Sequence, residues 1–488
     1  MTVQTSPTAN SSRLLDYGSA LAVYSGTGTL HSAATPPTEV SFEAGQLHDG
    51  QSLLLCSKPL PLRDAILLHF GGAAEPETVG FEGVSVEGWQ LTTVGDLSWI
   101  NYLPETERPG SYNAFRARQI DVTFSEKRAV EHRFGLVNFQ FSGTRSVEVL
   151  RAGGAHRIQG LPLKLRVGGD RVEALIVPVP NAQDLHSKVI TVKTYAVLSE
   201  LIVRAPARCD TKEFEQALAD LCLVLSVARG TRVQWIYRED WSEKARVKIS
   251  HRSYLTKPYC PLAPISPRYE QRESTSRFVD AALEALPKRE AFSLHSGIIA
   301  VYLDAKAEGD YTQTRGAKIA VAIEKLKNVF LRVPNCGVKD FVIDEAVFEE
   351  LISKISQWVK SNLPRGLSRD ELDQIAGSSK VSGLNRTGFK RILDALCRFV
   401  GFNPDRGEVR LFIASRNSLV HRGEFYCDSA TAVERKRLPP FPDATSEFFF
   451  LVSFLDRLFL KLLNYSGPYT DWRQWQRLPD DDPTSELP

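Results

Sequence analysis

The hydrophobic pattern changes about halfway along this chain of 488 residues, and this change constrains the fold more than any other feature. Up to about residue 205, short apolar or alternating runs are separated by Gly, Pro and Asp or Asn turns, a pattern typical of β-strands. From Ser274 to Tyr465, apolar residues recur at helical spacing instead. We therefore predict an α+β multidomain chain, with an N-terminal β-sandwich-like or jelly-roll-like domain and a C-terminal all-α bundle.

Four parts of the chain follow from this pattern. We predict a β-rich domain at 1–205, a helix with two strands and a Pro-rich linker at 206–271, a helical domain at 272–470 and an acidic tail at 471–488. The helix of the second part should cover 211–228, between a cap at Asp210 and Gly230. The strands predicted for the first part are 52–56, 65–69, 88–94, 120–124, 134–141, 161–167, 172–179 and 189–203.

Composition narrows the functional classes. With a net charge of +2 the chain is not broadly basic, so any nucleic-acid site must be a local patch. The seven cysteines are scattered without a close pair, which indicates neither a zinc site nor a disulfide framework. We expect no metal and no cofactor. Residues 1–12 lack the apolar core of a secretory signal, so we expect a cytoplasmic protein. Charges interrupt the apolar run 448–463, so we expect a buried helix there and no membrane contact.

An arginine followed five residues later by a histidine occurs three times, and context distinguishes the three pairs. Arg151 and His156 bracket Gly-rich sequence that predicts a loop, and Arg246 and His251 bracket a strand-like alternation. The third pair, Arg416 and His421, lies in a run with helical apolar spacing and no Gly between residue 408 and Gly423. Only this third pair is predicted to lie on one rigid helix.

Arg416 falls near the middle of the apolar stripe of that helix, whereas Asn417 and His421 lie at its edge, four residues apart. A guanidinium on an apolar face needs a partner, so we expect a carboxylate, a phosphate or a second copy of the chain. A structural interpretation also fits these residues: the arginine can extend its charge to water, and a histidine near a helix end can serve as a C-terminal cap.

The segment Arg416-Asn417-Ser418-Leu419-Val420-His421 resembles the signature of the HEPN superfamily, in which Arg, a polar residue, three further residues and His lie in an all-helical domain. The resemblance covers about residues 272–465. It implies a metal-independent ribonuclease whose composite active site forms where two protomers bring their signatures together. In this chain Arg416 would hold the scissile phosphate, His421 would move the proton and Asn417 would orient one of them.

The resemblance extends to an earlier helix, predicted at 317–330, whose Ala322-Ile323-Glu324 is similar to an Ala-Leu-Glu stretch of larger bacterial HEPN domains. Glu324 is then a candidate partner for Arg416, although the sequence alone slightly favours an ordinary solvated glutamate. Some HEPN toxins carry a Tyr two residues after the His. Here Gly423 stands at that position, so no role of that Tyr can be carried over.

The residue types suit RNA cleavage. Attack by a 2′-hydroxyl on the adjacent phosphate needs a base near neutrality, a proton donor for the leaving oxygen and a cation on the phosphate oxygens, which His and Arg supply. The expected product is a 2′,3′-cyclic phosphate, and DNA should resist because it lacks the nucleophile. Arg435, Lys436 and Arg437, in a predicted loop after the signature, are candidates for contacting the RNA backbone.

The order of a β-rich half, a long helix and a C-terminal HEPN-like domain resembles the bacterial ApeA-like proteins of abortive infection. This likeness implies a role in anti-phage defence, a homodimer formed through the helical domain, and a sensing or regulatory N-terminal half that responds to a phage-derived trigger.

Two other interpretations remain open. Many HEPN domains serve as dimerisation or nucleotide-binding modules, in which case Arg416 and His421 would be a structural ion pair and a cap. Alternatively, the β-rich half would bind a carbohydrate or a phage protein through aromatic side chains such as Trp89, Trp99 and Tyr102, with the helical half as a scaffold.

Overall fold

The computed structural model describes most of the chain. The described residues are 14, 20–32, 36–47, 50–56, 79–102, 113–151, 154–192, 195–204, 211–243, 245–254, 262–266, 272–292, 297–307, 310–362 and 385–473. The predicted strand 65–69 therefore lies outside the described residues.

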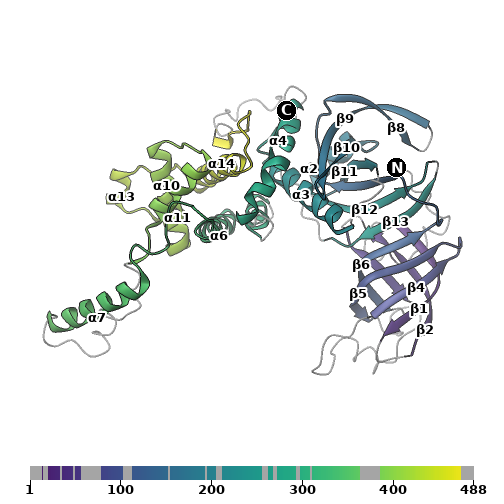
Figure 1. Cartoon of the computed structure of the whole chain (residues 1–488), viewed down its shortest axis with the longest axis horizontal. Coiled ribbons are helices and arrows are strands. Elements are labelled where there is room, and N and C mark those ends of the chain that lie inside the picture. The colour runs from purple at the N-terminus through teal and green to yellow at the C-terminus, as the bar shows by residue number, and fades with distance from the viewer. Residues whose placement is uncertain are drawn as a thin grey trace. The chain divides into compact units, whose positions relative to one another are not determined.

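The described residues form two compact units, each with its own core (Figure 1). The β-rich unit comprises Met1–Glu284 with Lys306–Gly309 and Gly467–Thr470, and the helical unit comprises the remainder. The predicted succession of a β-rich part and a helical part is thus confirmed. The boundary lies after Glu284, beyond the predicted linker at 206–271. Much of that predicted linker region belongs to the β-rich unit, since its strands at 234–241 and 246–252 pair inside the N-terminal sheet.

The β-rich unit is built on a 13-stranded sheet with the order β3-β2-β1-β4-β5-β6-β13-β12-β7-β11-β10-β9-β8. Its strands are β1 (Ala20–Ser32), β2 (Thr38–Leu47), β3 (Ser52–Cys56), β4 (Val79–Ser85), β5 (Gln90–Tyr102), β6 (Asn113–Thr123), β7 (Glu131–Val137), β8 (Arg145–Arg151), β9 (Gly154–Val167), β10 (Asp170–Pro178), β11 (Val197–Arg204), β12 (Gln234–Trp241) and β13 (Arg246–Arg252).

Strand β6 closes part of this sheet into a barrel. One of its edges pairs with β5 along most of its length, and its other edge pairs first with β3, at Asn113–Ala117, and then with β13, at Gln119–Thr123. The pairing of β3 with β6 closes strands β1 to β6, and the remaining strands extend from β13. The prediction of a sandwich is therefore corrected to a closed barrel with an extension of the same sheet, because one long strand serves both parts.

The barrel interior is apolar, with Phe42, Leu54, Phe81, Phe115 and Ile120 among its buried residues. Trp89 packs edge-on against Phe124 at a centroid distance of 4.8 Å, at the margin of this core. This position favours a packing role for Trp89. The side chains of Trp99 and Tyr102 lie outside the described residues, although both residues belong to β5.

A buried polar network joins the barrel to the extension. The Tyr24 hydroxyl lies 2.9 Å from Nε2 of His251, whose Nδ1 lies 3.1 Å from Oε1 of Gln46. The Gln46 amide donates to the carbonyl oxygens of Ile236 and Arg252 at 2.6 and 3.0 Å. Burial lowers the pKa of His251 to about 3, so the imidazole is neutral at physiological pH and its Nε2 accepts a hydrogen bond from the Tyr24 hydroxyl. The Arg246 and His251 pair is therefore structural, because its histidine is buried in this network.

Two helices lie along the sheet extension. The helix α3 (Thr211–Arg229) confirms the prediction for 211–228 and ends at Gly230, whose φ of +65° is one that glycine adopts without strain. The helix α2 (Ala182–Val192) corrects the predicted strand 189–203, which begins only at β11. Partial or full burial at Ala182, Leu185 and Val189 follows a helical period. The strand prediction rested on the apolar composition of the segment and missed this period.

Other helices of the helical unit pack around one apolar helix, α14 (Ala444–Leu462). This confirms the predicted buried helix at 448–463. The other helices are α4 (Arg272–Ala285, largely in the β-rich unit), η4 (Leu286–Phe292), α5 (Ile298–Lys306), α6 (Thr312–Phe330), α7 (Glu345–Asn362), α10 (Phe389–Val400), α11 (Arg406–Arg422), α12 (Tyr426–Ser429) and α13 (Ala432–Arg437). Helices α6, α10 and α11 lie beside α14 (Figure 1), and α12 also contacts it. Phe412 of α11 stacks on Phe454 of α14 with ring centroids 4.0 Å apart. None of the helices in the described ranges is both long enough and apolar enough to cross a membrane.

Candidate functional site

The signature lies on α11, whose two ends are fixed by local sequence. At its start, the Asp405 carboxylate accepts a hydrogen bond from the Glu408 N–H at 2.8 Å, and the Glu408 carboxylate reaches back to the Asp405 N–H at 3.3 Å. This reciprocal pair is a capping box. At its end, Gly423 adopts a φ of +74°. The predicted helical placement of Arg416 and His421 is confirmed.

Arg416 is 8% exposed, and its guanidinium has several partners. Its Nε donates to Oε1 of Glu324 at 2.7 Å, and Nη2 donates to the same oxygen. Its Nη1 donates to Oδ1 of Asn417 at 2.8 Å. The Phe389 ring of α10 lies beneath the guanidinium, 4.6 Å from its central carbon. The structure thus brings together Glu324, Arg416 and Asn417, and the expected carboxylate partner of Arg416 is Glu324.

Glu324 is held by two cations. Lys327, one turn further along α6, donates to Oε2 at 2.5 Å, while Arg416 binds Oε1. Partial burial acts to raise the pKa of Glu324, but the hydrogen bonds and charges of Lys327 and Arg416 outweigh it, so this pKa lies below its ordinary value. Glu324 therefore remains a carboxylate at neutral pH and can orient Arg416, but it cannot donate a proton.

His421 and Asn417 lie on the exposed side of α11. Among the residues that the structure describes, His421 makes no hydrogen bond or ion pair, so its ring nitrogens are open to solvent. The adjacent Arg422 turns away, donating to the Ser429 carbonyl at 2.8 Å and to Glu434 at 3.3 Å. The helix thus carries an accessible imidazole five residues after a guanidinium that Glu324 and Asn417 hold in place.

The basic run after the signature is not in a loop, which corrects that prediction. Residues 432–437 form α13, and the Thr431 and Glu434 side chains make a capping box at its start. Arg435 donates to the carbonyl oxygens of Cys427 and Ala430 at 2.7 and 2.9 Å. Arg435 therefore fixes the turn after α12, whereas the side chains of Lys436 and Arg437 are exposed. The Thr-x-x-Glu spacing was the sequence signal for this helix.

Two contributors to the site were not predicted. Lys327 follows Glu324 by three residues on a helix, a spacing that by itself indicates contact. Phe389 comes from α10, far from Arg416 in sequence, and no local pattern indicates its position. Exposed basic residues also occur at Arg386, Lys390, Arg391 and Arg398, whereas Lys380 lies outside the described residues.

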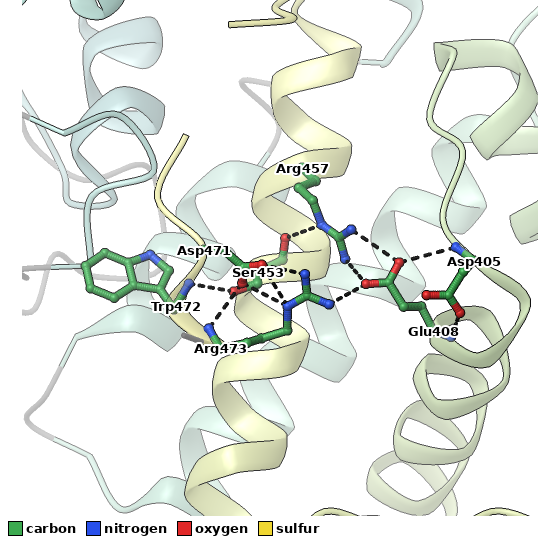
Figure 2. Close-up of polar contacts among 7 residues, drawn as sticks. All are labelled: Asp405, Glu408, Ser453, Arg457, Asp471, Trp472 and Arg473. Atoms are coloured by element: carbon green, nitrogen blue, oxygen red, sulfur yellow. Dashed lines mark hydrogen bonds and ion pairs between the residues drawn. The ribbon is translucent and has the colours of Figure 1, made fainter. Parts of the chain in front are cut away.

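A second polar cluster holds the start of α11 in place (Figure 2). The Glu408 carboxylate accepts hydrogen bonds from Arg457 of α14 at 2.8 and 3.2 Å and a further bond from Arg473. Arg473 also binds Asp471, and the backbone N–H of Trp472 donates to the Ser453 hydroxyl at 3.1 Å. Residues 471–473 are thus part of the helical unit, which corrects the prediction that the tail begins at 471, while 474–488 lie outside the described residues.

Comparison with known proteins adds no relative: no protein-family model matches the chain, and neither the curated proteins nor the solved structures contain a significant match.

Proposed function

We propose that this protein is a metal-independent endoribonuclease that cleaves RNA through 2′-hydroxyl attack, acts in anti-phage defence as a homodimer and is regulated by its N-terminal half. The observation that carries the proposal is the accessible imidazole of His421 on the same rigid helix as Arg416. A histidine can exchange a proton near neutrality, and an arginine can bind phosphate oxygens through parallel N–H groups.

The contacts of Arg416 are compatible with phosphate binding. Its guanidinium has five N–H donors, and Glu324 and Asn417 accept three hydrogen bonds from it. The donors left over can approach a phosphate oxygen, while Glu324 keeps the group from rotating. His421 of one protomer would remove the 2′-hydroxyl proton, and a histidine of the second protomer would protonate the departing 5′-oxygen. The products would carry a 2′,3′-cyclic phosphate and a 5′-hydroxyl.

RNA cleavage by the full chain in excess chelator tests this proposal. We expect wild type to cut single-stranded RNA and leave cyclic phosphate ends, His421→Ala to lose at least about 100-fold in rate, and matched DNA to remain intact. His31→Ala is the control, because His31 is an exposed histidine of the β-rich unit. Equal cutting by wild type and His421→Ala, or no cutting by wild type, would refute the proposal.

A noncatalytic role is the second candidate, and one observation favours it: Arg416 is nearly buried and is already paired with Glu324. In that case the pair joins α6 to α11 and serves a dimerisation or nucleotide-binding module. The two candidates differ in what His421→Ala changes. The noncatalytic role predicts unchanged RNA in the assay above and an altered dimer fraction in analytical ultracentrifugation.

A further inference from the structure

The β-rich unit contains a cavity of about 390 Å³ on the outer side of the barrel wall. Its lining includes Ser98 of β5, Arg116 and Arg118 of β6, Arg232 from the turn before β12, and Tyr254 after β13. The volume lies within the range of roughly 300–1,000 Å³ that is typical of small-molecule sites.

Strand register explains why these side chains converge. Arg116 and Arg118 are two residues apart and share one face of β6, and Arg116 is paired directly with Ser98. The intervening Ala117 and its partner Leu97 point into the barrel core, so the arginines point outward. The cavity lies where the pairing of β6 passes from β3, whose first residue lies opposite Ala117, to β13, whose last residue lies opposite Gln119.

Main-chain hydrogen bonds hold the walls in position. The Ser253 N–H donates to the Arg118 carbonyl at 2.8 Å, and the Tyr254 N–H donates to the Gly50 carbonyl at 2.7 Å. These bonds fix the segment after β13 against both β6 and the turn before β3. The site is therefore formed before a ligand arrives, which lowers the entropy cost of binding.

The charges of the cavity are unbalanced. Arg116 donates to the neutral Gln51 side chain at 2.8 Å, and its Nε is buried without a hydrogen-bond partner. Across the described ranges, the Arg118 side chain makes no hydrogen bond or ion pair. Nη1 of Arg232 lies 3.5 Å from the Tyr254 hydroxyl, which is also neutral. Among the described residues that line the cavity, Asp96, which is exposed, supplies one carboxylate for three guanidinium groups.

This combination of donors identifies the ligand chemistry. Clustered guanidinium groups repel one another, and an anion that all of them contact relieves that repulsion. A carboxylate offers two oxygens and one charge, whereas a phosphomonoester offers three terminal oxygens and a charge of about −1.5 to −2 at pH 7. Three arginines with the hydroxyl groups of Ser98, Ser253 and Tyr254 suit the phosphate better, and the cavity has room for a group attached to it.

We infer that this cavity of the β-rich unit binds a small phosphorylated molecule through its phosphate, with Arg116, Arg118 and Arg232 as the ligands of that group. This site does not depend on the proposed RNA cleavage, because all of its residues belong to the β-rich unit.

Isothermal titration calorimetry of the full chain tests the inference with three probes: inorganic phosphate, ribose 5-phosphate and acetate. We expect the two phosphates to bind with one site per chain, ribose 5-phosphate at least as tightly as inorganic phosphate, and acetate to give no saturable heat. Arg118→Gln should weaken phosphate binding roughly tenfold or more, because it removes a charge-assisted contact. Since the Arg118 side chain makes no hydrogen bond or ion pair with the described residues, this variant should keep the wild-type unfolding temperature.

The matched control is Arg157→Gln, an arginine of β9 outside the cavity lining that bonds Ser146. We expect it to bind phosphate like wild type. Absence of phosphate binding by wild type, equal binding of acetate, or the same affinity in Arg118→Gln and Arg157→Gln would each overturn the inference. If Arg118→Gln lowers the unfolding temperature, Ser98→Ala replaces it, with a weaker phosphate affinity expected.

Discussion

The contact between Glu324 and Arg416 decides what the signature helix can do. An arginine that is 8% exposed would be costly without a counter-charge, and Glu324 supplies that charge from α6. The same contact serves either candidate function, because it fixes the guanidinium for a phosphate or joins two helices. Substitution of Glu324 therefore measures the structural part of its role separately from any activity.

We predict that Glu324→Gln lowers the free energy of unfolding of the helical unit by about 1–3 kcal/mol at neutral pH, because Arg416 and Lys327 both lose a charged partner. Chemical denaturation measures this change. Glu350→Gln is the control, since Glu350 pairs with Lys354 on α7 with both side chains mostly exposed, and its loss should cost well under about 1 kcal/mol. Equal effects of the two substitutions would contradict the prediction.

The same carboxylate gives a pH dependence. The folded pKa of Glu324 lies below its ordinary value of 4.5. Its stabilisation is therefore complete above pH 4.5 and is lost as the pH falls through the folded pKa. We predict that the difference in stability between wild type and Glu324→Gln shrinks as the pH is lowered from 4.5, as measured by denaturation at each pH. A constant difference would show that this carboxylate does not titrate with folding.

At the scale of elements, the ends of α11 were readable from the sequence, but its anchoring was not. Asp405, Glu408 and Gly423 are local signals, and the structure confirms the ends that they mark. The two arginines that bind Glu408 come from α14 and from residue 473, which no local pattern connects to it. The predicted strand at 189–203 was wrong over its first residues, which belong to the helix α2. There the apolar composition favoured a strand prediction more strongly than the helical period favoured a helix.

We predict that Glu408→Gln destabilises the helical unit by about 2–4 kcal/mol, because it leaves Arg457 and Arg473 with weaker partners in a largely buried site (Figure 2). Thermal or chemical unfolding measures this loss. Glu434→Gln is the matched control, since Glu434 occupies the same capping-box position of α13 and its ion pair with Arg422 is exposed. The prediction fails if the two substitutions have similar effects.

At the scale of the whole molecule, the described residues form two compact units, each with buried apolar side chains. The core of the barrel includes Leu54, and that of the helical unit includes Phe454, and neither residue is exposed. Units with their own cores can unfold independently. The β-rich unit extends past residue 252 because β12 and β13 pair with strands far earlier in the sequence, between β6 and β7.

We predict that calorimetry of the full chain shows two unfolding transitions. Leu54→Ala should lower the temperature of one of them and Phe454→Ala that of the other, since each substitution leaves a cavity that costs about 2–5 kcal/mol. A single transition that both substitutions shift equally would show that the two units unfold as one.

The sequence by itself determined the two classes of structure along the chain and the positions of the helices α3, α11 and α14, and a family resemblance suggested the pairing of Glu324 with Arg416. Such features depend on residues close together in sequence, because helical period and capping act within a few turns. Only the tertiary structure decided the closure of the barrel through β6, the insertion of β12 and β13, and the convergence of Arg116, Arg118 and Arg232 on one cavity. Each of these depends on strand register and on contacts between distant segments, for which a single sequence contains no local signal.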